Sequence, residues 1–251
     1  MRGVFRQLHY GASQHVDYKS PAANERLIFA MDVPDFARAR RLAEELGDSV
    51  TFYKLGLELM MSGGYFDLVD WLLARDRKVF ADLKFFDIPA TVGSAVRQLK
   101  DRGVSFVTVH GNQSIMQAAA ENKGSDLKVL AVTVLTSLDR GDLDDLGFEC
   151  DVEELVLSRA RRAFEAGCDG VISSGLEVAR LREHVDRRLL VVTPGIRPVE
   201  NKPSNDQKRV VTVADAFTSG ADYIVVGRPI RDADKPRDAA EAIQATIKSL
   251  F

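Results

Sequence analysis

The segment KVFADLKFFD, residues 78–87, begins with a short apolar run and then carries two opposite charges that are two positions apart. The run is apolar on both faces of an extended chain, which is typical of a parallel strand that is covered by helices. Because side chains alternate along a strand, Asp82 and Lys84 would leave it on the same face as Phe80. The segment therefore predicts a buried strand with a carboxylate and an ammonium together at its carboxyl end.

Seven further short runs of this kind recur along the chain. Including the first, the eight predicted strands are Leu27–Val33, Val50–Leu55, Lys78–Lys84, Phe106–His110, Lys128–Leu135, Gly170–Ser173, Leu189–Pro194 and Tyr223–Gly227. Segments with helical spacing of apolar residues lie between them. The predicted helices are Asp35–Leu46, Gly63–Ala74, Pro89–Arg102, Gln113–Asn122, Val152–Ala166, Glu177–His184, Val213–Ser219 and Pro236–Leu250.

This alternation predicts an α/β fold, a single (β/α)8 TIM barrel over residues 26–251. The alternative is a doubly wound sheet, which would favour a glycine-rich turn after the first strand, and residues 31–35 read MDVPD. The longest segments without a periodic pattern are Ser137–Asp151 and Arg197–Arg209. Both follow predicted strands, where barrel enzymes carry their active-site loops.

Composition limits the possible partners. The 251 residues are 45% hydrophobic and 28% charged with a net charge of -3, so no overall basic field favours nucleic acid or an anionic membrane. No apolar run approaches the roughly 18 residues that span a bilayer. Residues 1–25 form a polar arm without the apolar centre of a secretory signal. Cys150 and Cys168 are isolated thiols, which indicates a reducing compartment, so we expect a cytoplasmic protein. From the charge and the apolar pattern we expect no membrane or nucleic-acid partner.

Charged residues gather at the predicted carboxyl ends of the first three strands. Asp32 ends the first strand and Lys54 the second, while Asp87 follows Asp82 and Lys84 in the next loop. Each could instead be a surface charge or part of a surface ion pair. Together, alternating charges would keep every lysine protonated and every aspartate ionised. Such an array suits chemistry that needs a fixed electric field.

The last two strands end in a pattern that is typical of phosphate sites. Barrels often bind phosphate with the loops after strands seven and eight, and those loops carry Arg197 and the pair Gly227 and Arg228. The alternative is that both arginines are solvated loop residues. His110 ends the fourth strand and could either hydrogen-bond within the site or cap the next helix. No residue spacing predicts a metal site, and we expect no cofactor.

Five motifs in order closely resemble the orotidine 5'-monophosphate decarboxylase family, from about Arg26 to Phe251. They are FADLKFFDIPATV (residues 80–92), FYKLG (52–56), TVLTS (133–137), TPGIRP (193–198) and DYIVVGRPI (222–230). The resemblance implies a metal- and cofactor-free barrel that converts orotidine 5'-monophosphate to UMP in pyrimidine synthesis. It also implies a homodimer with shared active sites.

By the same resemblance, Lys84 protonates C6 of the pyrimidine as CO2 leaves, with Asp82 beside it and Asp87 of the partner subunit near the substrate carboxylate. The resemblance also assigns the substrate-binding residues: Lys54, Asp32 and Thr91 of the partner subunit at the ribose, Ile88, Thr136 at the pyrimidine edge, and Gln207, Gly227 and Arg228 at the phosphate, with Arg197 at the start of the phosphate loop. Phe85 and Phe86 at the barrel mouth are two aromatics that a partner would cover.

Two other functions remain open from the sequence. Sister barrels that act on sugar phosphates share the D-x-K-x-x-D strand but use Mg2+, with an acidic ligand where this chain has Lys54. A lysine there would repel the metal ion. The second alternative is a non-catalytic barrel that binds a phosphorylated ligand, although the complete set of Lys54, Asp82, Lys84 and Asp87 argues against it.

Overall fold

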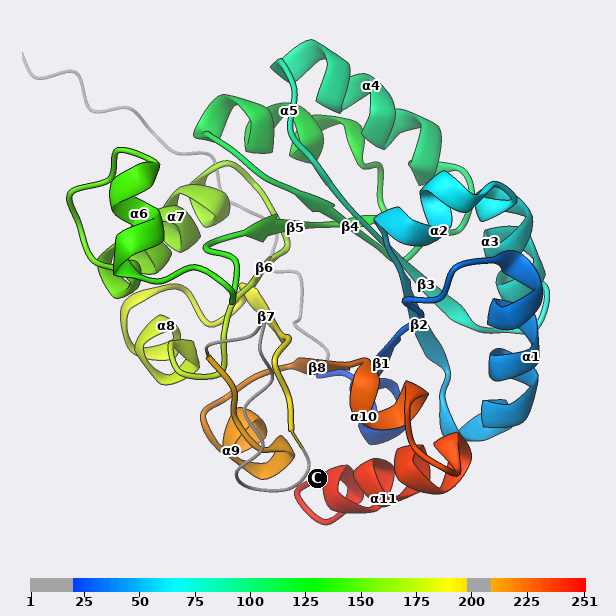
Figure 1. Cartoon of the computed structure of the whole chain (residues 1–251). Helices are drawn as coiled ribbons and strands as arrows, with labels where there is room; N and C mark the ends of the chain where they lie inside the picture. The colour runs from blue at the N-terminus through cyan, green and yellow to red at the C-terminus, as the bar shows by residue number, and fades with distance from the viewer. Residues whose placement is uncertain (1–19, 198–208) are drawn as a thin grey trace, which may run out of the picture.

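Eight parallel strands close into a barrel in the computed structural model, which describes residues 20–197 and 209–251 (Figure 1). The strands are β1 (Leu27–Ala30), β2 (Phe52–Leu55), β3 (Lys78–Phe85), β4 (Phe106–Val109), β5 (Lys128–Val132), β6 (Gly170–Ile172), β7 (Leu190–Thr193) and β8 (Tyr223–Val226). Neighbours pair in chain order, and β1 also pairs with β8, which closes the barrel. The predicted TIM barrel is confirmed and the doubly wound alternative is wrong.

Helices surround the barrel on its outer side (Figure 1). The main ones are α1 (Phe36–Leu46), α3 (Tyr65–Leu73), α4 (Pro89–Lys100), α5 (Gln113–Asn122), α7 (Val152–Glu165), α8 (Val178–His184), α9 (Val213–Thr218) and α11 (Pro236–Lys248). All eight match a predicted helix, and Asp35 caps α1 by accepting a hydrogen bond from the backbone N–H of Arg38 at 2.8 Å. None of the helices within the described ranges is long and apolar enough to cross a membrane.

Three short helices at the barrel mouth were not predicted. They are α2 (Leu57–Ser62), α6 (Arg140–Asp145) and α10 (Arg228–Arg231). The segment that begins at Ser137 is therefore not irregular throughout, because Asp139 starts α6 with a capping box. The predicted helix from Gly63 is also wrong at its start. Gly63 and Gly64 have φ values of 81° and 70°, in the left-handed region, so they separate α2 from α3.

Two apolar layers fill the protein. The outer layer lies between the strands and the helices, and the inner layer lies inside the barrel. Four aromatic rings form the centre of the inner layer, with ring centroids 5.0–6.0 Å apart: Phe52, Phe80, Phe106 and Tyr223. These rings fill the middle of the barrel, and Phe80 also lines the cavity that opens at the carboxyl ends of the strands.

The carboxyl end of β3 is irregular. The pairing of β3 with β4 shifts register between Ala81 and Phe85, and Lys84 between them has a φ of 47°. At this bulge Phe85 packs, half-buried, against the outer apolar layer of its own chain, so it does not need a partner to cover it. Phe86, as predicted, is 69% exposed.

Candidate active site

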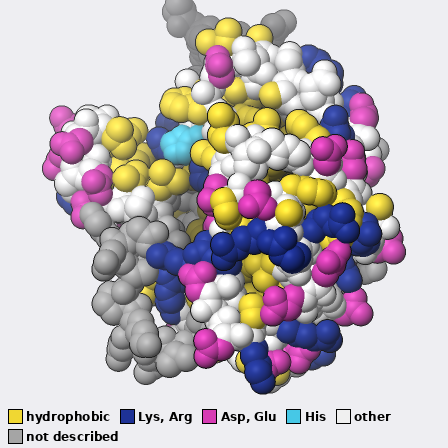
Figure 2. All heavy atoms as spheres, turned by 45° about the vertical axis from the view of Figure 1, so that its right-hand side comes forward, with side chains coloured by type: hydrophobic (Ala, Val, Ile, Leu, Met, Phe, Trp, Pro, Cys, Tyr) yellow, Lys and Arg dark blue, Asp and Glu magenta, His cyan; other side chains and the backbone are white. Residues whose placement is uncertain are grey.

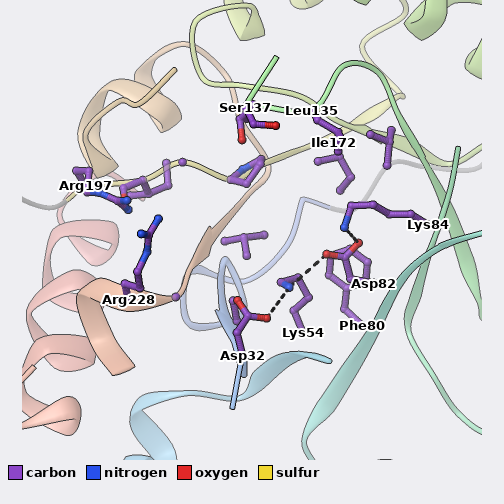
Figure 3. Close-up of a pocket in the computed structure, with 18 of the residues that line it drawn as sticks. Asp32, Lys54, Phe80, Asp82, Lys84, Leu135, Ser137, Ile172, Arg197 and Arg228 are labelled. Atoms are coloured by element: carbon purple, nitrogen blue, oxygen red, sulfur yellow. Dashed lines mark hydrogen bonds and ion pairs between the residues drawn. The ribbon is translucent and has the colours of Figure 1, made fainter. Parts of the chain in front are cut away.

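A cavity of about 480 Å³ opens at the carboxyl ends of the strands, inside the barrel mouth (Figure 3). This volume lies in the range of small-molecule sites. Eight of the predicted site residues line it: Asp32, Lys54, Asp82, Lys84, Thr136, Arg197, Gly227 and Arg228. They come from loops and strand ends far apart in the sequence, which the closed barrel brings to one place.

Four of these residues form a continuous row of alternating charge (Figure 3). Lys54 Nζ lies 3.2 Å from Asp32 Oδ1 and 3.3 Å from Asp82 Oδ2. Lys84 Nζ lies 2.9 Å from Asp82 Oδ1. The two inner side chains, Lys54 and Asp82, are only 12% and 11% exposed, whereas Lys84 is 33% exposed. The row therefore has a buried centre and ends in an ammonium that a ligand can reach.

The pKa values of the buried pair move in the directions that keep both groups charged. Burial acts to lower the pKa of the Lys54 ammonium, but Asp82 and Asp32 outweigh it and raise that pKa above its usual value. Burial acts to raise the pKa of the Asp82 carboxyl, but Lys54 and Lys84 outweigh it and lower that pKa. Lys54 and Asp82 thus provide fixed charges at neutral pH at the centre of the row.

Thr108 on β4 completes this row, although the sequence did not single it out. It is fully buried, and its hydroxyl donates to Asp82 Oδ1 at 2.8 Å and accepts from the backbone N–H of Lys84 at 3.0 Å. Phe80 pairs with Phe106, so Thr108 faces Asp82 two positions further along both strands. The alternation along β4 was the signal that could have identified it.

The opposite end of the cavity is cationic. Arg197 follows β7 and Arg228 follows β8, and their side chains point toward one another across this end (Figure 3). Gly227 between β8 and Arg228 packs closely on β1, because a Cβ there would lie only 3.3 Å from Ala30 Cβ. Arg231, one turn along α10, also lines the cavity and donates to the backbone carbonyl of Asp32 at 2.8 Å. The sequence missed Arg231 because α10 was not predicted.

An apolar wall connects the charged row to the cationic end. It consists mainly of β5 and β6 residues and the loop after β5, with Thr136 and Ser137 as polar members: Val132, Val134, Leu135, Thr136, Ser137 and Ile172. The sequence did not single out Ser137. A ligand with a flat ring between an anionic tail and a reactive end would match these three regions.

Three predicted site residues do not line the cavity of this chain. Asp87, Ile88 and Thr91 are exposed on the rim, after β3 and at the start of α4. Asp87 Oδ1 accepts a hydrogen bond from the backbone N–H of Ile88 at 2.6 Å. Gln207 lies outside the described residues.

His110 does not line the cavity either. Asn112 caps α5 by accepting from the backbone N–H of Ile115 at 3.2 Å, so the helix-cap alternative for His110 is wrong. The imidazole packs against Phe86, with ring centroids 5.6 Å apart, and its Nδ1 is buried without a hydrogen-bond partner. Burial lowers its pKa, and Arg159 and Lys84 act in the same direction. Over the described ranges, no group of three or more His, Cys, Asp or Glu side chains is arranged to hold a metal ion.

The closed barrel with its charged cavity at the strand ends defines the chain as an enzyme of the (β/α)8 class. Residues 25–243 match the family described as "Orotidine 5'-phosphate decarboxylase / HUMPS family", and the chain belongs to this family.

Similar proteins agree with this membership. The orotidine 5'-phosphate decarboxylase of Methylococcus capsulatus is 68% identical over 227 residues, which cover 90% of this chain and 93% of that protein. The orotidine 5'-phosphate decarboxylase of Nitrobacter winogradskyi is 50% identical, covering 90% and 94%. The crystal structure of orotidine 5'-phosphate decarboxylase from Lactobacillus acidophilus superposes with a TM-score of 0.79 at 35% identity, covering 89% of this chain and 99% of that one. The resemblance seen in the sequence motifs is confirmed.

Proposed function

We propose that this enzyme converts orotidine 5'-monophosphate to UMP and CO2, in pyrimidine biosynthesis in the cytoplasm, without a metal ion or an organic cofactor. The observation that carries the proposal is the row Asp32–Lys54–Asp82–Lys84 at one end of the cavity. An arginine pair lies at the other end, and an apolar wall connects the two ends. The names of its relatives support the same reaction.

Lys84 supplies both charge stabilisation and a proton. When the bond between C6 and the carboxylate breaks, CO2 leaves and the electron pair stays on C6, where no carbonyl group can delocalise it. An ammonium held beside C6 stabilises that charge and then donates its proton to form UMP. Asp82 holds the Lys84 ammonium at 2.9 Å and keeps it oriented. Lys84 regains a proton from solvent after the product leaves.

The other predicted residues orient the nucleotide. Lys54 and Asp32 bind the ribose hydroxyls, and Thr136 meets the edge of the pyrimidine. The phosphate binds to Arg228 and the backbone at Gly227, with Gln207 as a further ligand and Arg197 at the start of the same loop. Because the phosphate is remote from C6, its binding energy can be used to hold the ring against the charged row.

The position of Lys54 supports a metal-free reaction. Its ammonium lies between two carboxylates, 3.2 Å from Asp32 and 3.3 Å from Asp82. It supplies the positive charge there and would repel a divalent cation. This arrangement disfavours the Mg2+-dependent sister barrels.

A second copy of the chain would complete the site. Phe86 and Ile88 on the rim are 69% and 66% exposed, and Met61 on α2 is 83% exposed. On the face that includes α2 and α3, hydrophobic side chains reach the surface in several patches beside a band of Lys and Arg (Figure 2). Large apolar side chains at a cavity rim are a common feature of interfaces. A homodimer would bury them and bring Asp87 and Thr91 of the partner subunit to the substrate, with Ile88 beside them.

The test is the ultraviolet absorbance change of orotidine 5'-monophosphate with purified protein, measured with and without EDTA. We expect turnover to UMP that EDTA does not alter. Activity that EDTA abolishes would favour a Mg2+-dependent barrel. Tight UMP binding with no turnover of orotidine 5'-monophosphate would favour a non-catalytic phosphate-binding barrel.

A further inference from the structure

Arg209 makes a buried contact between three loops of the barrel mouth, and the proposed chemistry does not use it. Its Nη1 donates to Glu177 Oε1 at 2.5 Å. Its Nη2 donates to the backbone carbonyls of Leu135 at 2.9 Å and Val134 at 3.3 Å. The side chains of Arg209 and Glu177 are only 11% and 8% exposed. Neither residue lines the cavity.

The carbonyls that Arg209 binds belong to the cavity wall. Val134 and Leu135 line the cavity immediately before Thr136, which is the proposed contact for the pyrimidine edge. A shift of these two residues would therefore move Thr136. The guanidinium thus fixes the backbone of the apolar wall from behind.

Arg209 is also tied to the arginine end of the cavity. Two residues further on, Val211 forms a parallel bridge with Ile196, and the N–H of Arg197 donates to the carbonyl of Val211 at 2.9 Å. Glu177 comes from the loop after β6 and begins α8, where its carbonyl accepts from the N–H of Leu181 at 2.9 Å. One side chain therefore joins the loops after β5, β6 and β7.

A buried ion pair is costly to form, so stability alone is a weak reason for this arrangement. We propose that Arg209 is a positioning residue that holds the Val134–Ser137 wall in register with Arg197, with Glu177 as the counter-charge that orients its guanidinium. This inference rests on the proposed function, because it concerns the placement of the pyrimidine ring. Arg209 itself touches neither the substrate nor the reacting atoms.

Arg182 provides a matched control at the other end of the barrel. It forms a comparable, slightly more exposed pair with Asp222 at 2.6 Å, with side chains 19% and 11% exposed. It also donates to the backbone carbonyls of Leu189 and Gly220, both at 2.8 Å. These contacts lie at the amino ends of β7 and β8, away from the cavity. Arg182→Lys therefore measures the cost of weakening such a pair without touching the site.

The experiment compares Arg209→Lys with Arg182→Lys by kcat/KM for orotidine 5'-monophosphate and by calorimetric titration with UMP. Lysine keeps the charge opposite Glu177 but cannot reach the carboxylate and both carbonyls with one planar group. We expect Arg209→Lys to lower kcat/KM about a hundredfold and to weaken UMP binding about tenfold, with one UMP still bound per chain. We expect Arg182→Lys to lower the unfolding midpoint and to leave both constants unchanged.

The positioning role of Arg209 can be contradicted even if one variant fails to fold or the proposed function is wrong. Unchanged constants in Arg209→Lys, or activity lost only in proportion to UMP sites lost, would overturn the positioning role. If Arg209→Lys does not fold, Glu177→Gln carries the test, and it should weaken UMP binding in the same direction. If the wild-type enzyme does not decarboxylate orotidine 5'-monophosphate, the proposed function fails, while the effect of each variant on UMP affinity still tests Arg209.

Discussion

Lys84 is held in a backbone conformation that a lysine rarely adopts. Its φ of 47° lies in the left-handed region, where a Cβ is disfavoured. Such conformations persist where the surroundings fix them, and they are frequent at functional sites. Here Thr108 accepts a hydrogen bond from the Lys84 N–H, and Asp82 holds the ammonium. The strain at this residue is consistent with selection for the direction of its side chain.

Replacing Lys84 should separate chemistry from binding. In Lys84→Ala, we expect turnover of orotidine 5'-monophosphate to fall at least ~1,000-fold, because both the stabilising charge and the proton donor are lost. UMP binding should remain largely intact, since UMP lacks the C6 carboxylate at which Lys84 acts. Steady-state kinetics and titration calorimetry measure the two effects. Lys78→Ala, at the amino end of β3, is the control. A wild-type rate in Lys84→Ala would contradict the role proposed for Lys84.

His110 should make stability depend on pH. Burial lowers its pKa below the usual 6.5, so the unfolded chain takes up a proton at a higher pH than the folded chain does. The contribution of His110 to stability is therefore complete above pH 6.5 and is lost as the pH falls through 6.5 toward the folded-state pKa. We expect urea unfolding to show this loss, with a slope of up to about 1.4 kcal/mol per pH unit. His110→Phe should remove this part of the slope, and an unchanged slope would contradict the assignment.

At the scale of elements, the junction of β3 and β4 determines the geometry of the charged row. Thr108→Val removes the acceptor for the Lys84 N–H and one hydrogen bond to Asp82. We expect it to lower the free energy of unfolding by about 1–3 kcal/mol and to lower kcat, because the bulge at Lys84 loses its support. Thr133→Val, just after the neighbouring strand β5, also removes a buried threonine hydroxyl, which donates to the carbonyl of Ile172, and serves as the control. Equal kcat values in the two variants would argue against the role of Thr108.

The strands could be predicted because each is apolar on both faces, a pattern that few other elements show. The bounds differ mainly at the carboxyl ends: β1, for example, ends at Ala30 and not at Val33. The short helices α2, α6 and α10 contain only 6, 6 and 4 residues, too few to repeat an amphipathic pattern. The bulge at Lys84 has no sequence signal either, since it depends on the hydroxyl of Thr108 in another strand.

Site residues could be predicted from the sequence where each one is a charged residue at the end of a buried strand. Lys54 and Asp82 are charges at the ends of buried runs, so the fold alone brings them together. Thr108 and Arg209 act through partners in other elements, and their residue types are ordinary in loops and strands. A single sequence does not show such pairings.

At the scale of the whole molecule, the cavity of one chain lacks Asp87. That residue is exposed on the rim beside Phe86 and Ile88, which are large and apolar. The proposed homodimer with shared sites would account for both observations, since a second copy would cover the apolar rim and bring an Asp87 carboxylate to the cavity. The dimer should therefore be testable by exchanging subunits.

Lys84→Ala and Asp87→Ala proteins should each be inactive alone and regain activity when mixed. A heterodimer of the two has one site with both residues intact and one with neither. If subunits exchange freely in an equal mixture, half of the dimers are of this kind, so up to about a quarter of the wild-type activity should return. Mass spectrometry of tagged chains shows whether exchange occurred. The control mixes wild-type chains with chains that carry both substitutions, where activity should fall toward the same fraction of intact sites. Exchange without recovered activity would mean that Asp87 serves its own chain or has no part in the reaction.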